Sequence, residues 1–161
     1  MSRPDETSAF EQFLRASGFD PKRWKHGAIP PGHSGFVGMR YRDHGDKWVE
    51  LEFDWREDLV GDPETGVIAS GPIISLLDNA TSMSVWATHK QFLPQVTLDL
   101  RIDYTRAAVP HRPIIARAEC YQLRRSMAFV RGIAHDGDPD DPVAHAAGVF
   151  ILVEPQEWAK A

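Results

Sequence analysis

Apolar residues dominate one stretch near the middle of the chain, from Ile73 to Ala87. Placed on a helix at about 100° per residue, these side chains cover most of the circumference and leave one narrow polar stripe. The stripe consists of Ser75, Asp78, Asn79 and Ser82. The pattern therefore predicts a long helix that other parts of the chain cover on nearly every side.

The predicted helix begins at a glycine-rich turn. Ser70 and Gly71 are both suitable N-cap residues, and Pro72 is a favourable first helical residue. Backbone N–H groups without a helical partner, and the positive end of the helix dipole, would therefore lie at this turn. Asp78 follows about two turns later. Backbone donors at the start of a buried helix, with a lone carboxylate further along, form the candidate site that the sequence predicts.

Polar and apolar residues alternate on both sides of the helix, as they do in half-buried strands. The clearest alternation sets Val96, Leu98, Leu100, Ile102 and Tyr104 against Thr97, Asp99, Arg101 and Asp103. Further strands are predicted over residues 36–42, 47–54, 114–123, 126–135 and 142–154. One long apolar helix with strands before and after it, and without a second helical layer, predicts an α+β fold in which a curved antiparallel sheet wraps around the helix.

The chain divides into three predicted segments. Residues 1–35 contain a short helix over residues 8–17, which starts with capping-box spacing, and then a proline-rich loop. Residues 36–154 form the predicted domain, in which residues 55–64 make an acidic loop. Residues 155–161 form a tail.

Composition excludes several classes of function. The 161 residues, 42% of them hydrophobic, suit one domain with a core. The longest apolar run has eight residues, Ala146 to Val153, whereas a membrane span needs about 20. We therefore expect a soluble, cytoplasmic protein without a membrane partner. A net charge of −5 argues against nucleic acid as the main partner.

Four segments resemble the hotdog-fold acyl-CoA thioesterases, in particular the phenylacetate-pathway and 4-hydroxybenzoyl-CoA types. The segments are Gly66–Asn79, Val96–Leu100, Tyr104–Ala108 and Arg124–Phe129. The resemblance implies a sheet wrapped around the helix, dimers that pair edge to edge, and active sites at the dimer interface. It also implies a homodimer or homotetramer.

One departure from the family lies at the turn before the helix. The family turn usually reads His-Gly-Gly, whereas this chain has Ala69, Ser70 and Gly71, and an upstream Asn or Gln of the family falls at Pro63. A backbone N–H stabilises an oxyanion without a histidine or glycine side chain, so the chemistry can survive this change.

The resemblance also implies roles for individual residues. Asp78 would act on the thioester carbon as general base or as nucleophile, and the sequence leaves both open. The backbone N–H groups of Ser70 and Gly71 would hold the carbonyl oxygen, and the Thr97 hydroxyl would hold the water or the acid. Substrate contacts are predicted at Asn79, Ser82, Arg106, Arg124, Arg125 and Ser126, with His111 and Arg112 as additions to the arginine patch.

The leading hypothesis is hydrolysis of an acyl-CoA thioester, with coenzyme A as part of the substrate and no metal or other cofactor. A non-catalytic hotdog protein that binds acyl-CoA or a small apolar ligand is the main alternative, and Ala69 favours it. A hydratase is a further alternative, although no histidine on the helix can pair with Asp78. An interaction domain whose basic strands contact an acidic partner is another. The sequence does not specify the acyl group.

Overall fold

The computed structural model describes residues 32–90 and 94–153. The helix predicted over residues 8–17 and the tail over residues 155–161 lie outside the described residues.

The domain consists of one long helix, two short helices and eight strands within the described residues. The helices are α3 (His33–Val37), the 3-10 helix η1 (Glu57–Leu59) and α4 (Ser70–His89). The strands are β1 (Arg40–His44), β2 (Trp48–Phe53), β3 (Val60–Asp62), β4 (Val67–Ile68), β5 (Gln95–Tyr104), β6 (Ile114–Leu123), β7 (Met127–His135) and β8 (Ala144–Leu152).

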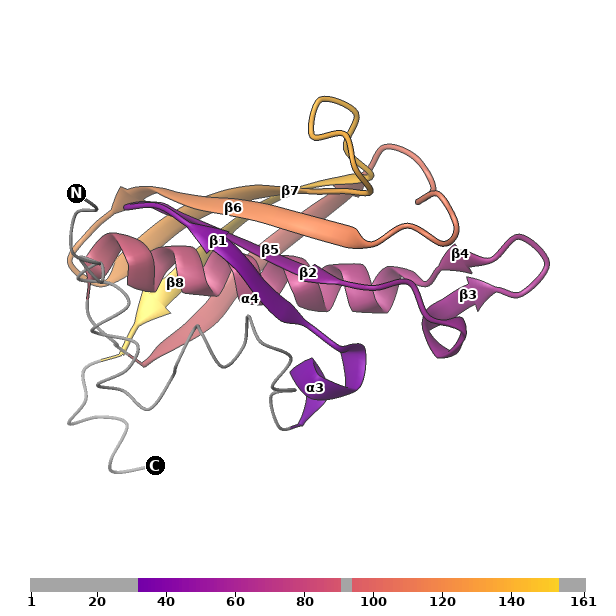
Figure 1. Cartoon of the computed structure of the whole chain (residues 1–161). Helices are drawn as coiled ribbons and strands as arrows, with labels where there is room; N and C mark the ends of the chain where they lie inside the picture. The colour runs from indigo at the N-terminus through magenta and orange to yellow at the C-terminus, as the bar shows by residue number, and fades with distance from the viewer. Residues whose placement is uncertain (1–31, 91–93, 154–161) are drawn as a thin grey trace, which may run out of the picture.

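Six strands form one antiparallel sheet in the order β1-β2-β6-β7-β8-β5, and β3 pairs with β4 in a separate hairpin. The sheet curls over α4 (Figure 1). This arrangement confirms the predicted long helix and curved antiparallel sheet. The strand β5 directly follows the helix in sequence order and lies at one edge of the sheet.

The core lies between α4 and the concave face of the sheet. Leu76, Leu77 and Ala80 of the helix are fully buried. Large residues of β2, such as Leu51 and Phe53, pack in this core, but the central strands contribute small ones: Ala116 and Ala118 of β6, Ala134 of β7, and Ala144 and Ala146 of β8. Small side chains let the helix approach the sheet closely, and close packing fixes the rotation of α4 and therefore the direction of its polar stripe.

The start of the domain differs from the prediction. The sequence predicts a loop up to Gly35 and a strand from Phe36, but α3 covers residues 33–37 and β1 begins only at Arg40. Gly38 adopts a left-handed conformation, with φ 79°, and ends the helix. Val37 and Met39 are both buried, so the alternation that suggested a strand comes from a helix end and the turn after it.

The predicted acidic loop over residues 55–64 is also more ordered than expected. It contains η1 and β3, and β3 pairs with β4 immediately before the long helix. The Ala69 N–H donates to the Leu59 carbonyl at 2.9 Å. A Cβ on Gly61 would lie 2.9 Å from the Ala69 Cα. The hairpin is therefore packed against the residue that precedes α4 and fixes where the helix starts.

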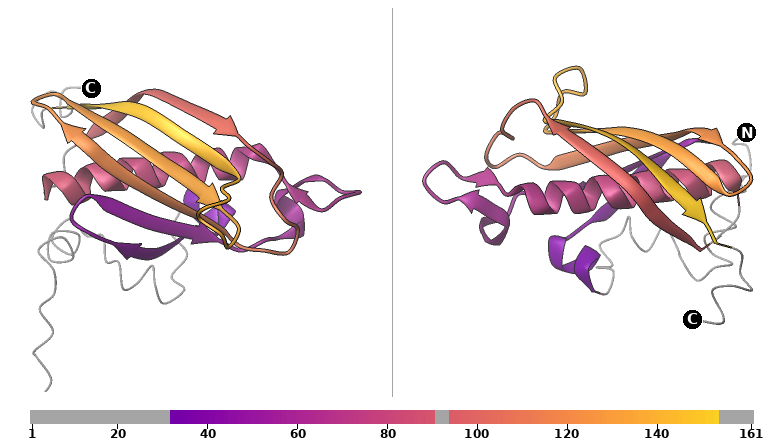
Figure 2. Two further views of the ribbon diagram at one scale, coloured as in Figure 1. Left: turned by 90° about the horizontal axis from the view of Figure 1, so that it is seen from above. Right: turned by 180° about the vertical axis from the view of Figure 1, so that it is seen from behind.

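The short helix α3 and the β3–β4 hairpin lie apart from the main sheet. Figures 1 and 2 show α3 on the side of α4 opposite the sheet, and the β3–β4 hairpin beyond the N-terminal end of α4. The polar stripe of α4 therefore has neighbours both on the sheet side, from β5, and on the open side, from α3.

Candidate active site

The polar stripe of α4 is lined by side chains from β5. The Thr97 hydroxyl donates to Asp78 Oδ1 at 3.0 Å. The Gln95 Nε2 donates to the Ser82 hydroxyl at 2.6 Å and to the Ser82 carbonyl at 2.8 Å. Two of the residues predicted for the site, Asp78 and Thr97, therefore contact each other directly.

A β-bulge in β5 makes the Thr97 contact possible. The register of β5 against β8 shifts between Thr97 and Asp99, and a bulge reverses the face on which the following residues lie. As a result, Thr97 points to the helix on the same side as Leu100, while Leu98 is 59% exposed. The strict alternation of the sequence predicts one apolar face along the whole strand, and the bulge divides it.

The start of α4 is open and carries no side-chain cap. The N-cap residue is Ala69, and not Ser70 or Gly71 as predicted, because Ala69 has the extended backbone of a cap (φ −60°, ψ 152°) and Ser70 is the first helical residue. No atom outside the local backbone lies within 4 Å of the position of a Cβ on Gly71. The side-chain position of Gly71, in the first helical turn, therefore faces open space.

Within one chain, the open helix start and the carboxylate are far apart. Gly71 and Asp78 are separated by seven residues, which corresponds to about 10 Å along the helix axis. The Tyr104 hydroxyl, at the far end of β5, donates to the Ser70 carbonyl at 3.1 Å. The strand β5 thus runs along the helix with Thr97 beside Asp78 and Tyr104 beside Ser70.

The other stripe residues bond within the chain. Asn79 Nδ2 donates to the Ser75 carbonyl at 2.9 Å. The Ser75 hydroxyl lies 2.9 Å from Nε2 of His33, which belongs to α3. Sequence reasoning missed His33, Gln95 and Tyr104 as neighbours of the stripe, because only the packing of α3 and β5 against α4 brings them there.

Arg106 is part of an ion-pair cluster. Its guanidinium donates to both carboxylate oxygens of Asp136 at 2.8 Å and to Asp141 Oδ2 at 2.9 Å. Asp136 is 3% exposed, and the hydrogen bonds from Arg106 and from the Val109 N–H lower the pKa of its carboxyl to about 2. The cluster connects the chain after β5 to the loop after β7. A contact between Arg106 and coenzyme A stays a prediction.

The remaining predicted substrate contacts lie away from the helix start. Arg124, Arg125 and Ser126 are exposed in the turn between β6 and β7, at the end of the sheet nearest the C-terminal end of α4 (Figure 1). His111 lies at the opposite end, where its ring packs against Trp55 in a tilted arrangement, with 4.1 Å between ring centroids. One chain therefore does not gather the predicted coenzyme A contacts in one place.

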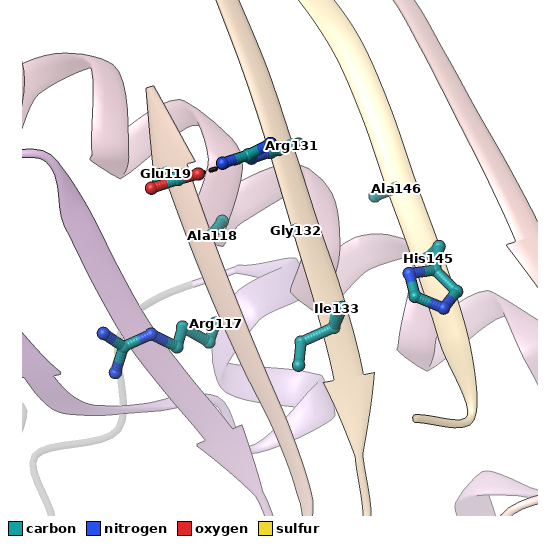
Figure 3. A pocket seen from close by; sticks show the side chains of 8 residues that line it. All are labelled: Arg117, Ala118, Glu119, Arg131, Gly132, Ile133, His145 and Ala146. Carbon is teal, nitrogen blue, oxygen red and sulfur yellow. Dashed lines mark hydrogen bonds and ion pairs between the residues drawn. The ribbon is translucent and has the colours of Figure 1, made fainter. Parts of the chain in front are cut away.

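Two hollows of about 400 Å³ occur among the described residues. One, of about 440 Å³, lies on the outer face of the sheet around Gly132 (Figure 3). Its charged residues are paired, Arg131 with Glu119 and Arg117 with Glu50. The other, of about 400 Å³, lies beside the β3–β4 hairpin and is lined by Trp55, Glu57, Val60, Pro63, Glu64, Thr65, Gly66 and His111. Only the second is near the start of α4.

Residues 32–90 and 94–153 lack two further kinds of feature. No group of three or more His, Cys, Asp or Glu side chains in these ranges could hold a metal ion. No helix in them is long and apolar enough to cross a membrane.

Similarity to known proteins agrees with this geometry. Residues 65–143 match a family model described as the thioesterase superfamily. A protein of Pseudomonas aeruginosa with a known crystal structure is 30% identical, with a TM-score of 0.68, and the match covers 90% of this chain and 97% of that one. No curated protein matches the sequence.

Two solved structures with lower identity share the fold. Zebra fish thioesterase superfamily member 2 has a TM-score of 0.70 at 19% identity, over 83% of this chain and 95% of that one. A phenylacetic acid degradation-related protein of Ralstonia eutropha has a TM-score of 0.66 at 23% identity. The match covers 82% of this chain and 98% of that one.

A curved antiparallel sheet around one helix, with a carboxylate on that helix, defines a protein of the hotdog class. The chain belongs to the thioesterase superfamily. Membership supports thioester hydrolysis as its class of reaction.

Proposed function

We propose that the protein hydrolyses acyl-CoA thioesters, with Asp78 as the residue that acts on the thioester carbon or activates a water. The observation that carries the proposal is the 3.0 Å hydrogen bond from Thr97 to Asp78 Oδ1 on the polar stripe of α4. Because Thr97 occupies one carboxylate oxygen and fixes the orientation of the group, the other oxygen is available for the reaction.

The site is completed by a second copy of the chain. The strand β5 lies at the edge of the sheet and exposes Val96, Leu98 and Tyr104, and an apolar edge strand is suited to pairing with another strand. Antiparallel pairing of two β5 strands about their middle would bring Thr97 of one subunit close to Tyr104 of the partner. Asp78, which contacts Thr97, would then face the Ser70 and Gly71 amides of the partner, which lie beside Tyr104.

This pairing supports a complete reaction. The thioester oxygen accepts hydrogen bonds from the helix-start amides, and Asp78 takes a proton from a water whose oxygen adds to the carbonyl carbon. The tetrahedral intermediate then breaks the carbon–sulfur bond, and the coenzyme A thiolate leaves and recovers a proton. With Asp78 as nucleophile, an anhydride forms first and water hydrolyses it.

Coenzyme A would extend toward the turn between β6 and β7. In the antiparallel pair, this turn of one subunit and the helix start of the other lie at the same end of the continuous sheet. Arg124, Arg125 and Ser126 would then bind the phosphate and pantetheine end, since arginine suits bidentate phosphate contacts. Asn79 and Ser82 would support the site from the helix stripe. Pairing of two dimers into a homotetramer is compatible with the same site.

The test is release of free thiol from a panel of acyl-CoAs. We expect Asp78→Asn to lower kcat by at least about 100-fold, because it removes the group that accepts the proton or attacks the carbon. Asp140→Asn is the matched control, since Asp140 is exposed in the loop between β7 and β8, away from α4. Equal rates for wild type and Asp78→Asn would exclude the proposal.

Binding without turnover is the second candidate, because Ala69 replaces the histidine usual in the family and leaves the helix without a side-chain cap. Tight binding of a non-hydrolysable acyl-CoA analogue, with no thiol release from the corresponding thioesters, would favour this candidate over hydrolysis.

A further inference from the structure

His33 is held in a fixed position beside α4. It is the first residue of α3, and two hydrogen bonds hold this short helix and the turn after it in place. Arg56 Nη2 donates to the Phe36 carbonyl at 2.8 Å, and the Met39 N–H donates to the Ser34 carbonyl at 2.9 Å. The buried side chains of Val37 and Met39 fix the segment on the core. Because the backbone of α3 is held in this way, the exposed imidazole of His33 has a defined position.

The imidazole of His33 contacts the stripe next to Asp78. Nε2 of His33 lies 2.9 Å from the Ser75 hydroxyl. Ser75 precedes Asp78 by three residues, and side chains at this spacing lie on one face of a helix with their Cβ atoms about 5–6 Å apart. The Ser75 hydroxyl therefore lies on the same face of the helix as Asp78, and its partner is His33.

The hydroxyl of Ser75 can supply what the pair of Asp78 and Thr97 lacks. Thr97 fixes the carboxylate, but a water beside the free oxygen of Asp78 needs a second partner to fix its own orientation. A serine hydroxyl both donates and accepts, and it rotates to suit its strongest partner. A bond to the His33 ring removes that rotation.

We propose that His33 is a positioning residue, which acts through the Ser75 hydroxyl to orient the water that Asp78 activates. The inference rests on the proposed thioester hydrolysis and adds to it the requirement that α3 is part of the site. Nothing on the helix itself replaces His33, because Asn79 uses its side-chain nitrogen on the Ser75 carbonyl and leaves the hydroxyl to the imidazole.

The test is a double-mutant cycle with steady-state kinetics on an acyl-CoA that wild type hydrolyses. We expect His33→Ala and Ser75→Ala each to lower kcat about tenfold, with KM within about twofold, because orientation and not binding is lost. The double variant should be no slower than either single one, since both break the same contact. His33→Gln, whose amide can still bond to the serine hydroxyl, should recover most of kcat.

His145→Ala is the matched control, because His145 lies on the outer face of the sheet, away from α4 (Figure 3), and it should leave kcat unchanged. Thermal unfolding separates positioning from folding, and the midpoints of all variants should stay close to that of wild type. Unchanged kcat in His33→Ala, additive losses, or no recovery in His33→Gln would overturn the role of His33 while wild-type turnover still supports the proposed hydrolysis. Absence of turnover in wild type would overturn both.

Discussion

Two carboxylates of this protein accept hydrogen bonds from side chains that lie far from them in the sequence. Asp78 accepts from Thr97, and buried Asp136 accepts from Arg106. The two carboxylates differ in their surroundings. Asp136 is buried beneath Arg106 and the segment that contains Val109. Asp78 is only partly buried, on the polar stripe of α4 beside β5. The first arrangement is suited to holding loops together, and the second to contact with a substrate.

The ion pair of Arg106 and Asp136 should control stability in acid. Its carboxyl pKa of about 2 lies below the ordinary value of about 3.9, so the pair stabilises the fold above about pH 4 and loses this contribution, about 2–3 kcal/mol, as the pH falls toward 2. We expect Arg106→Met to lower the free energy of unfolding at pH 7 by about 3 kcal/mol, because it leaves a buried charge without its cation. Between pH 4 and pH 2, the free energy of unfolding of Arg106→Met should fall by less than that of wild type.

Urea unfolding at pH 7, 4 and 2 measures both effects. Arg101→Met is the matched control, since Arg101 pairs with Asp103 where both side chains are mostly exposed, and we expect a change within about 1 kcal/mol. The same loss in both variants would contradict a special role for the Asp136 cluster.

At the scale of the elements, β5 determines the geometry of the site. Its bulge at Leu98 brings Gln95 and Thr97 to the helix, while the rest of the strand contributes Leu100 and Ile102 to the core. The bulge lies opposite Val149 and Phe150 of β8, next to Gly148, where the two backbones approach closely. Packing between β5 and β8 therefore controls the distance from Thr97 to Asp78.

Adding one methyl group at Gly148 should disturb this packing. A Cβ there would lie 2.6 Å from the Asp99 carbonyl oxygen, a distance that requires backbone movement. We expect Gly148→Ala to destabilise the protein by about 1–3 kcal/mol and to lower kcat as Thr97 moves. Gly71→Ala is the control for stability, because the space around Gly71 is open, and its unfolding midpoint in urea should be no lower than that of wild type. Equal midpoints for the two variants would contradict the prediction.

At the scale of the whole molecule, the active site is expected to need two chains. The separation of Gly71 and Asp78 along one helix prevents both from reaching the same carbonyl group, and the exposed edge of β5 offers the surface on which a second copy can complete the site. Subunit pairing and catalysis are therefore linked, and a mixture of defective subunits can test the link.

We expect two inactive variants to restore activity when they are co-expressed. Asp78→Asn removes the carboxylate, and Ser70→Pro removes one helix-start N–H at a position where proline is well tolerated. A mixed dimer contains one site with both groups intact. Random pairing should therefore recover about one quarter of wild-type thiol release. Each variant alone, purified in the same way, is the control, and no recovery in the mixed sample would show that the site does not combine residues of two chains in this way.

Periodicity in the sequence predicts the long helix, the strands of the main sheet and the wrapping of that sheet around the helix. The apolar helix with one polar stripe and the alternating strands after it require a sheet that wraps around the helix, because only that arrangement covers so many apolar side chains. The same patterns predict that Asp78 lies on the polar stripe of the helix. They also predict that Thr97 and Val96 point to opposite faces of their strand. These features depend on local periodicity, which a single sequence contains.

The tertiary structure decided which polar groups meet. The bulge at Leu98, the short helix α3 and the hairpin before α4 have weak local signals, since each depends on packing against a distant part of the chain. For this reason the periodicity did not predict that His33 reaches Ser75 or that Arg106 is paired with buried Asp136. A contact between Thr97 and the acid was implied only by the family resemblance, and the packing of β5 on α4 forms it. Hydrogen bonds between residues far apart in the chain form only once the hydrophobic core has fixed the elements that carry them.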